Sequence, residues 1–192
     1  MKISTITFRF RVESCFDDEC LAGFVLEAPA RAARLHLEEP PCCHISSTFP
    51  TAIEIIPRPS SHARIKLRVF CKSKRIVGVG ARSQREIDDT QAALATLFGD
   101  TVKVWSGDIV LINANASLSP TGLDLAAAEL ELRASGASVD RGEERHKLVA
   151  KVSGGTIQLF ATGKACVHAR GWDELGRLTS LVRRVCGSSR RR

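Results

Sequence analysis

In two segments of this chain apolar and polar residues alternate one by one, which predicts a β-strand in each. Residues 3–12 alternate so that Phe8 and Phe10 fall on one face and two arginines fall on the other. Residues 62–70 repeat the pattern, with branched apolar residues on one face and a row of cations ending in Phe70 on the other. Such alternation is typical of strands with one buried face. We therefore expect a sheet with an apolar inner side and a cationic outer side.

A period near 3.6 marks helices between the strands. Ser83 and Glu86 have the spacing of a capping box, apolar residues follow at helical intervals, and a glycine ends the pattern. An earlier helix is expected to be capped by Asp17 or Asp18. Residues 28–48, which are rich in alanine, arginine and proline, are expected to form an irregular insertion.

One stretch of the chain occurs twice. The segment FCKSKRIVGVGAR with its helix (70–98) returns as FATGKACVHARG with another helix (160–186). A strand and a helix precede each copy, so we expect two pseudo-symmetric repeats, 1–99 and 100–187, followed by a basic tail at 188–192. One copy cannot bury its sheet face alone, so the two are expected to pack together. The other expected elements are strands at 49–56, 75–81, 108–116, 147–152, 156–160 and 164–169, helices at 119–133 and 172–185, and a polar connection at 135–145.

The composition argues against several classes of protein. Of the 192 residues 44% are hydrophobic, which is enough for a packed core, and no apolar run is long enough for a membrane helix. Seven irregularly spaced cysteines and an alternating amino-terminal segment predict neither a disulfide framework nor a secretion signal. A net charge of +7 favours a polyanionic partner. We expect no membrane association and no small-molecule substrate.

Several short motifs follow one another along the first half, and the last of them return in the second half. They are FPTAI at 49–53, PRP at 57–59, a strand ending in Phe70, RIVGVGAR at 75–82, and then Phe160 with TGKACVHA at 162–169. In order, spacing and duplication they resemble the conserved core of the TATA-box-binding protein family over essentially the whole chain. The resemblance implies an α+β saddle. In this fold one curved antiparallel sheet places its concave side on the minor groove of DNA, and helices cover the convex face.

The site residues expected on this basis are aromatic wedges with flanking cations. A protein that deforms the minor groove inserts apolar side chains between base steps, so it needs an aromatic at the end of an exposed strand. Phe70 and Phe160 hold that position in the two copies, and Phe49 matches the partner wedge of the first copy. Cations on the face of Phe70 are expected to contact phosphates. The expected DNA-binding residues are Phe49, Phe70, Phe160, Arg64, Lys66, Arg68, Val77, Val79, Asn113, Asn115, Lys147, Lys151 and His168.

The chain also departs from the family pattern. The partner wedge of the second copy is missing, since the matching position falls at 145–146. The groove-reading asparagine of the family is replaced in both copies, and Asn113 and Asn115 are expected to take over because they share a strand face with one of the replaced positions. A threonine of the family becomes Val79 in one copy and His168 in the other. A preference for A·T-rich DNA is implied by the fold, because the minor groove distinguishes A·T from G·C and little more.

Cysteines and histidines raise two other hypotheses. Cys15, Cys20, Cys42, Cys43 and His44 would suffice as zinc ligands, but their spacing is not that of a zinc finger or ribbon, so no metal or cofactor is expected. A Cys43 nucleophile with His44 as its base is disfavoured, because adjacent residues of a strand face opposite sides. No catalytic residue is therefore expected.

The resemblance implies a non-enzymatic basal transcription initiation factor that binds A·T-rich double-stranded DNA. General transcription factors and the RNA polymerase machinery are its expected partners. The nucleus is its expected location, or the site of viral transcription if the source is a large DNA virus. One alternative is a diverged scaffold without DNA binding inside a transcription assembly, which the missing wedge and asparagine favour. A saddle domain that serves a nuclease or glycosylase in trans is disfavoured by the lack of a paired-carboxylate motif.

Overall fold

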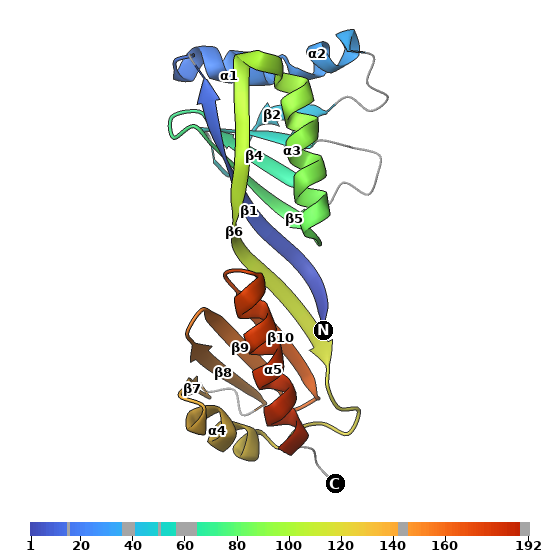
Figure 1. The fold of residues 1–192 in the computed structure, drawn as a ribbon, viewed down its shortest axis with the longest axis vertical. Coiled ribbons are helices and arrows are strands. Elements are labelled where there is room, and N and C mark those ends of the chain that lie inside the picture. Colours follow the sequence, from blue (N-terminus) through green and yellow to red (C-terminus); the bar gives the residue numbers. More distant parts are fainter. Residues whose placement is uncertain (15, 36–40, 50, 57–64, 142–145, 189–192) are drawn as a thin grey trace. The chain divides into compact units, whose positions relative to one another are not determined.

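The computed structural model describes residues 1–14, 16–35, 41–49, 51–56, 65–141 and 146–188 (Figure 1). Within these residues ten strands form one antiparallel sheet in the order β2-β3-β4-β5-β1-β6-β10-β9-β8-β7, together with five α-helices. The expected α+β class is confirmed. The strands are β1 (Lys2–Ser14), β2 (Cys42–Ile45), β3 (Ala52–Ile56), β4 (Lys66–Phe70), β5 (Arg75–Ala81), β6 (Val102–Ser117), β7 (Ser138–Asp140), β8 (Lys147–Val152), β9 (Gly155–Phe160) and β10 (Lys164–Ala169). The helices are α1 (Asp18–Leu26), α2 (Ala28–Arg34), α3 (Gln84–Phe98), α4 (Leu125–Ala134) and α5 (Trp172–Ser188), with a 3-10 turn at Gly99–Thr101.

The chain divides into two compact units. The N-terminal unit is Ile6–Ile109, and the C-terminal unit combines Met1–Thr5 with Val110–Arg192. β1 and β6 therefore contribute to both units. The first residues of β1 group with the end of β6, where the Ser4 hydroxyl donates a 3.0 Å hydrogen bond to the Asn113 carbonyl. This division differs from the predicted repeat boundary at 99 and 100, and the repeat boundaries themselves stay a prediction.

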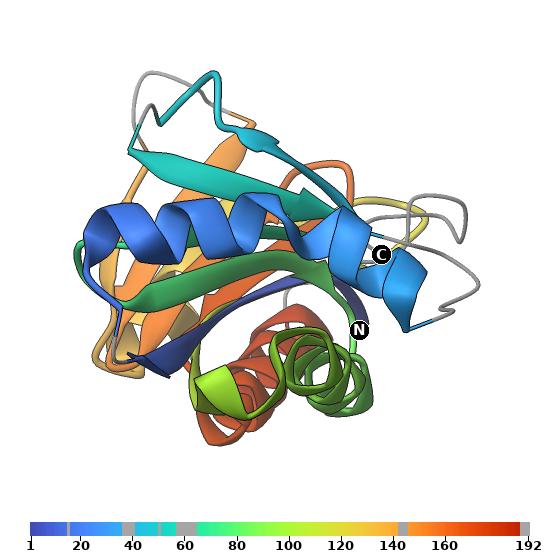
Figure 2. The ribbon, with the colours of Figure 1, turned by 90° about the horizontal axis from the view of Figure 1, so that it is seen from above.

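The N-terminal unit is held by an apolar face of its strands. Phe8 and Phe10 of β1 are completely buried, and α3 buries Ile87 and Leu94. Figure 2 shows α3 on one side of β1 and β5. Gly78 of β5 makes room for the Phe8 ring, because a Cβ at this position would lie 2.1 Å from it. The alternation predicted for β1 is thus the one that builds the core.

The cap of α3 differs in one detail from the expected capping box. The Ser83 hydroxyl accepts from the Glu86 N–H at 3.2 Å, as expected for an N-cap. The Glu86 carboxylate accepts from the Arg82 N–H at 2.7 Å instead of from the N–H of Ser83. The hydrogen bond from the backbone to the Glu86 side chain therefore comes from the residue before the N-cap and not from the N-cap itself. The helix ends at Gly99, whose φ of +60° suits glycine.

The expectation of an irregular insertion at 28–48 is wrong. α2 and β2 both lie in this region. Pro29 falls in the first turn of α2, where the missing N–H has no intrahelical partner to lose, and the surrounding alanines favour a helix. β2 pairs with β3 and places His44 opposite Glu54. The region therefore adds a strand to the sheet.

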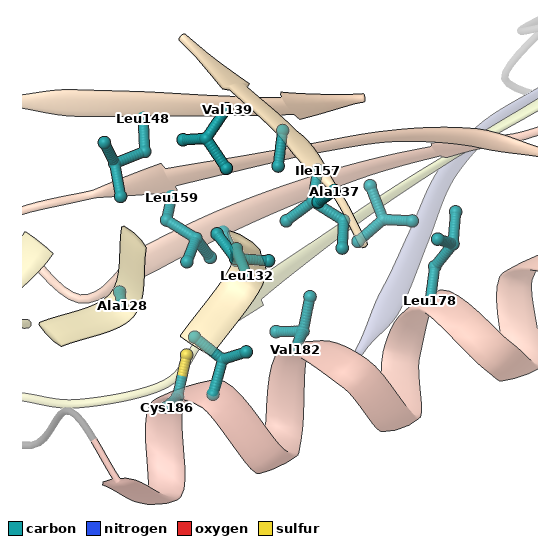
Figure 3. Packing of buried hydrophobic residues seen from close by; sticks show 14 of the residues in the cluster. Ala128, Leu132, Ala137, Val139, Leu148, Ile157, Leu159, Leu178, Val182 and Cys186 are labelled. Carbon is teal, nitrogen blue, oxygen red and sulfur yellow. The ribbon is translucent and has the colours of Figure 1, made fainter. Parts of the chain in front are cut away.

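The core of the C-terminal unit lies between its strands and the helices α4 and α5 (Figure 3). Leu148, Ile157 and Leu159 of β8 and β9 are completely buried in it. Leu132 of α4 and Val182 of α5 belong to the same cluster. Each of these strands therefore packs one of its faces against the helices. None of the helices in the described ranges combines the length and apolar character needed to cross a membrane.

Two elements of the C-terminal unit differ from the prediction. The helix expected at 119–133 begins at Leu125, because Asp124 is the N-cap: its carboxylate accepts from two backbone N–H groups at 2.9 and 3.2 Å. The polar connection expected at 135–145 contains β7, which buries Val139. The start of α4 is set by this local cap, whereas β7 is a short polar segment whose weak local signal is overridden by tertiary packing.

Candidate nucleic-acid interface

Each unit has a sheet face opposite to its core, called here its open face. The open face of the N-terminal unit carries exposed or half-buried side chains of β1 to β5, namely Thr7, Arg9, Arg11, His44, Glu54, Lys66, Arg68, Phe70, Arg75, Val77 and Val79. The open face of the C-terminal unit carries those of β6 and β8 to β10, namely Asn113, Asn115, Ser117, Lys147, Val149, Lys151, Thr156, Gln158, Phe160, Lys164, Cys166 and His168. Apart from Phe49, every predicted DNA-binding residue that the structure describes belongs to one of these faces. Arg64 lies outside the described residues.

The two predicted wedges of the first repeat touch each other. Phe70 ends β4 and is half-buried on the open face. Phe49 lies in the turn before β3, is 41% exposed, and meets Phe70 edge to face with ring centroids 6.1 Å apart. The turn is fixed because the Ala52 N–H donates to the Phe49 carbonyl at 2.8 Å and the Phe49 N–H donates to the Ser46 hydroxyl at 3.2 Å. Neither ring is part of the core.

An acidic residue lies among the cations of this face. Glu54 is opposite Arg68, whose Nε donates to Oε1 of the carboxylate at 3.0 Å. The Ser46 hydroxyl donates to the same oxygen at 2.8 Å, and Nε2 of His44 lies 3.6 Å from Oε2. The Ser46 hydrogen bond, followed by that of Arg68, holds the pKa of Glu54 below its ordinary value. Glu54 is therefore ionised at neutral pH and offsets part of the charge of Arg68.

A hollow of about 150 Å³ lies on the same face. Among the described residues, Lys66, Arg68, Val77 and Val79 line it. The strand register places Lys66 opposite Val79 and Arg68 opposite Val77, so each cation has an apolar neighbour. The Arg68 guanidinium also lies over the Phe49 ring, 4.9 Å from its centroid, which is within the range of a cation–π contact. The hollow thus combines positive charge with apolar surface.

A β-bulge in β5 separates Val79 on the open face from Ala81 in the core. The pairing of β1 with β5 shifts between Ile6, opposite Ala81, and Thr7, opposite Val79. The extra residue is Gly80, whose φ of +112° is readily adopted by glycine. Simple alternation already points Val79 outward, where it is 38% exposed, and the bulge turns Ala81 into the core.

Phe160 has the same position in the C-terminal unit as Phe70 in the N-terminal unit. It is the last residue of β9 and is half-buried on the open face. Lys147 of β8 is opposite Phe160, and Lys164 at the start of β10 is exposed. His146, at the position of the missing partner wedge, is exposed, and Arg145 lies outside the described residues. Cations therefore flank this aromatic.

Two predicted DNA-binding residues of the C-terminal unit form a hydrogen bond with each other. His168 is opposite Asn113, and Nδ1 of the imidazole lies 2.5 Å from Oδ1 of the amide. An amide oxygen can only accept, so Nδ1 of His168 is the donor. The amide NH₂ of Asn113 is left as a donor, and Asn115 lies two residues further along β6, opposite Cys166. The open face over β6 and β10 therefore carries side chains that can form hydrogen bonds.

Some residues of the open faces were missed by sequence reasoning. Arg9 and Arg11 alternate with the buried residues of β1, and pairing with β5 places them opposite Val77 and Arg75. The alternation itself is visible in the sequence, but only the adjacency of β1 and β5 brings these arginines to the other cations. Gln158 of β9 was missed because only the pairing of β9 with β10 and β8 places it beside the other polar side chains of its open face. Arg9 also forms a 3.0 Å ion pair with Asp108 of β6.

The cysteines do not gather into a site in the described part of the chain. No group of three or more metal-binding side chains occurs among the described residues, and Cys15 lies outside them. Burial raises the pKa of the Cys43 thiol to about 11, so this thiol is protonated at neutral pH. Cys43 is opposite Ile55 and His44 is opposite Glu54, so the two neighbours face opposite sides of β2. This geometry does not bring a base to the thiol.

No family model and no curated protein matches the sequence. Among solved structures, the TBP of Methanococcus jannaschii is similar to this chain, with a TM-score of 0.60 and 15% sequence identity over 97% of both chains. The fold is TBP-like. This agrees with the architecture expected from the repeated motifs, and at this identity it is the fold that the likeness establishes.

Proposed function

We propose that this chain binds double-stranded DNA through the open faces of its two units and acts as a basal transcription initiation factor. The main support is that Phe70 and Phe160 each end a strand, half-buried on an open face and close to cations. Half-buried aromatics on an open sheet face, in register with cations, suit a protein that deforms a duplex while holding its phosphates. The TBP-like fold supports the same function.

In the proposed mechanism the aromatic rings enter the minor groove. Phe49 and Phe70 act as a pair and Phe160 acts in the other unit, each ring separating neighbouring base pairs. Unstacking costs a few kcal/mol per step and is offset by the additional protein surface that a bent duplex contacts. Lys66, Lys147 and Lys151 contact phosphates. Steps rich in A·T are preferred because G·C pairs add the amino group of guanine to the minor groove.

The helices are proposed to serve other partners. α3 and α5 each bury one side in a core and leave polar side chains on the other. General transcription factors and the RNA polymerase machinery would bind these outer sides while the sheet holds DNA. The protein would act in the nucleus, or at the site of viral transcription if it comes from a large DNA virus. No catalytic step is part of this function.

The experiment compares Phe70→Ala and Phe160→Ala with the wild-type chain. Binding is measured by fluorescence anisotropy with an A·T-rich duplex, and bending is measured by energy transfer between dyes at its two ends. Each substitution is expected to lower affinity about tenfold or more and to reduce the bend, because insertion drives the deformation. Trp172→Ala is the control: Trp172 is also aromatic and 38% exposed, but it belongs to α5.

The control variant should bind and bend DNA like the wild type. Wild-type affinity and bending in both phenylalanine variants would overturn the insertion mechanism. Absence of any salt-dependent duplex binding by the wild-type chain would overturn DNA binding altogether.

A second candidate function is that of a scaffold without DNA binding inside a transcription assembly. The observation that favours it is Glu54, a carboxylate placed among the cations of an open face and bonded to Arg68. A negative charge on a DNA-binding surface repels phosphates, whereas it would suit a protein partner that carries its own cations. Salt titration separates the two functions, since binding to phosphates weakens steeply as the salt concentration rises.

A further inference from the structure

The open faces of the two units can be compared position by position through the strand registers. Phe70 ends β4 and Phe160 ends β9, so these two residues define equivalent rows of side chains. The row two residues before each phenylalanine contains Glu54, Arg68, Val77 and Arg9 in the N-terminal unit. The equivalent row in the C-terminal unit contains Val149, Gln158, Cys166 and Asn115.

Across this central row the C-terminal unit has amides where the N-terminal unit has arginines. Arg68 corresponds to Gln158, and Arg9 corresponds to Asn115. In the next row Lys66 corresponds to Thr156. The two faces are therefore related by fold but not by chemistry: one carries charge in the middle of the sheet, and the other carries neutral groups that can donate and accept hydrogen bonds.

On the open face of the C-terminal unit the cations lie outside the central row. Lys147 is opposite Phe160, and Lys151 is opposite Thr156, so both belong to β8. Lys164 is the first residue of β10. The positions between them, on β9, β10 and β6, hold Gln158, Cys166 and Asn115. Positive charge is thus placed around a neutral centre.

From this difference we infer a division of roles that rests on the proposed function. The open face of the C-terminal unit reads base edges in the minor groove, through Asn113, Asn115 and Gln158. The open face of the N-terminal unit contacts phosphates through its cations, whereas in the C-terminal unit phosphate contacts are left to the lysines around the amides. Cations bind phosphates without regard to sequence, whereas amides can distinguish the acceptors that every base pair presents in the minor groove from the amino group that only guanine adds.

The side chains of the reading face are partly fixed before DNA arrives. The hydrogen bond from His168 to Asn113 orients that amide so that its NH₂ group remains available as a donor. Donors of this kind match N3 of adenine and O2 of thymine, which are acceptors. No side-chain hydrogen bond holds Gln158 in the described ranges, so its amide can adjust to the base pair it meets.

The test measures two quantities for each variant of the full chain. The first is the slope of log affinity against log salt for an A·T-rich duplex. The second is the ratio of affinities for that duplex and for one in which G·C pairs replace the central A·T pairs. Lys66→Gln with Arg75→Gln removes two exposed cations of the N-terminal unit. It is expected to flatten the salt slope by about two and leave the affinity ratio unchanged.

The matched variants change the C-terminal unit. Asn115→Ala and Gln158→Ala are each expected to reduce the affinity ratio about tenfold and leave the salt slope unchanged. Asn115 is exposed, so its replacement does not disturb the core. Arg183→Gln removes an exposed charge from α5, a helix that packs on the core side of its own unit, and is expected to change neither quantity.

The outcomes separate this inference from the function on which it rests. If the wild type binds DNA but the lysine–arginine variant and the amide variants change both quantities alike, the division of roles is wrong and DNA binding stands. A changed affinity ratio in the lysine–arginine variant with none in the amide variants would also overturn it. If the wild type shows no salt-dependent binding, the proposed function fails and the division of roles fails with it.

Discussion

Glu54 and Arg68 face each other across β3 and β4 and form an ion pair, with 3.0 Å between Oε1 and Nε. The Glu54 side chain is only 13% exposed, and the hydroxyl of the buried Ser46 donates to the same oxygen. The Arg68 guanidinium lies over the ring of Phe49, which in turn meets Phe70. One carboxylate is therefore connected, through Arg68 and Phe49, to Phe70 of this open face.

Removal of this carboxylate is expected to strengthen DNA binding. In Glu54→Gln the amide can still accept from Ser46, but Arg68 loses its counter-ion and can turn toward a phosphate. Affinity for a duplex at low salt should rise about fivefold, which corresponds to the ~1 kcal/mol between unit charges about 4 Å apart in water. The gain should shrink as salt increases, because screening weakens the contact. Anisotropy titrations at several salt concentrations measure the effect.

Glu129→Gln is the control for this substitution. Glu129 of α4 also binds arginines, Arg133 at 2.9 Å and Arg141 at 2.5 Å, but it lies on a helix and not on an open face. Its affinity for DNA should equal that of the wild type. Equal affinity of Glu54→Gln and the wild type would mean that Arg68 does not reach a phosphate.

Acid should destabilise the chain partly through Glu129. Hydrogen bonds from Arg133, and next from Arg141, hold the pKa of Glu129 below its ordinary value. A lowered pKa in the folded state contributes stability above the unfolded value of about 4.3, and this contribution is lost as pH falls through the folded pKa. The melting temperature of Glu129→Gln should therefore be lower than that of the wild type at pH 7, and the difference should narrow below about pH 4.

A second glutamate of the same helix provides the comparison. Glu131→Gln removes the same charge from α4 at a residue for which the described ranges contain no side-chain ion pair. Its melting curves should follow those of the wild type across the pH range. A constant difference between Glu129→Gln and the wild type from pH 7 to pH 3 would contradict the role given to this carboxylate.

The N-cap of α3 is expected to stabilise the N-terminal unit. Ser83→Ala removes the hydroxyl that accepts from the Glu86 N–H, and it should lower the free energy of unfolding by about 1 kcal/mol. Urea unfolding followed by circular dichroism measures the change. Ser180→Ala on α5 removes a serine whose hydroxyl only donates back to the Gly176 carbonyl, so it should cost almost nothing. Similar losses of unfolding free energy in both variants would show that the N-cap hydrogen bond does not stabilise the unit.

Most strands of this fold could be predicted from the sequence because their signals are local. Alternation in β1 and β4 identified the faces that bury Phe8 and Leu67, and the repeated phenylalanines identified Phe70 and Phe160 as equivalent residues. Each of these inferences needs only residues that are close in the chain, since a strand with one buried face has a period of two.

What could not be predicted depends on contacts between distant segments. Arg9 joins the cations of β4 only because β1 lies beside β5, and Glu54 meets Arg68 only through the pairing of β3 with β4. β7 is three residues long and β2 is four, too short for alternation to mark them. Register and adjacency are set by the packing of the whole sheet, which a short polar segment does not encode.

Gly163 is expected to be required for the turn that follows Phe160. Its φ is +81°, and a Cβ there would lie 2.0 Å from the Ser119 carbonyl oxygen. Gly136 has the same φ of +81°, with nothing within 4 Å of a Cβ. Gly136→Ala should therefore cost only the ~1–2 kcal/mol of a left-handed alanine, measured by urea unfolding. Gly163→Ala should cost clearly more, because the Ser119 backbone must move as well.

The same substitution should also weaken DNA binding. The Gly163 N–H donates to the Phe160 carbonyl at 2.9 Å, and the Gly163 carbonyl accepts from the Leu118 N–H at 2.7 Å. A shift of this turn therefore moves the end of β9, where the proposed wedge residue lies. Gly163→Ala should lose affinity for an A·T-rich duplex at a temperature where it is still folded, whereas Gly136→Ala should bind like the wild type. Equal unfolding free energies for the two variants would show that the turn can move away from Ser119, and the predicted loss of binding would then have no structural cause.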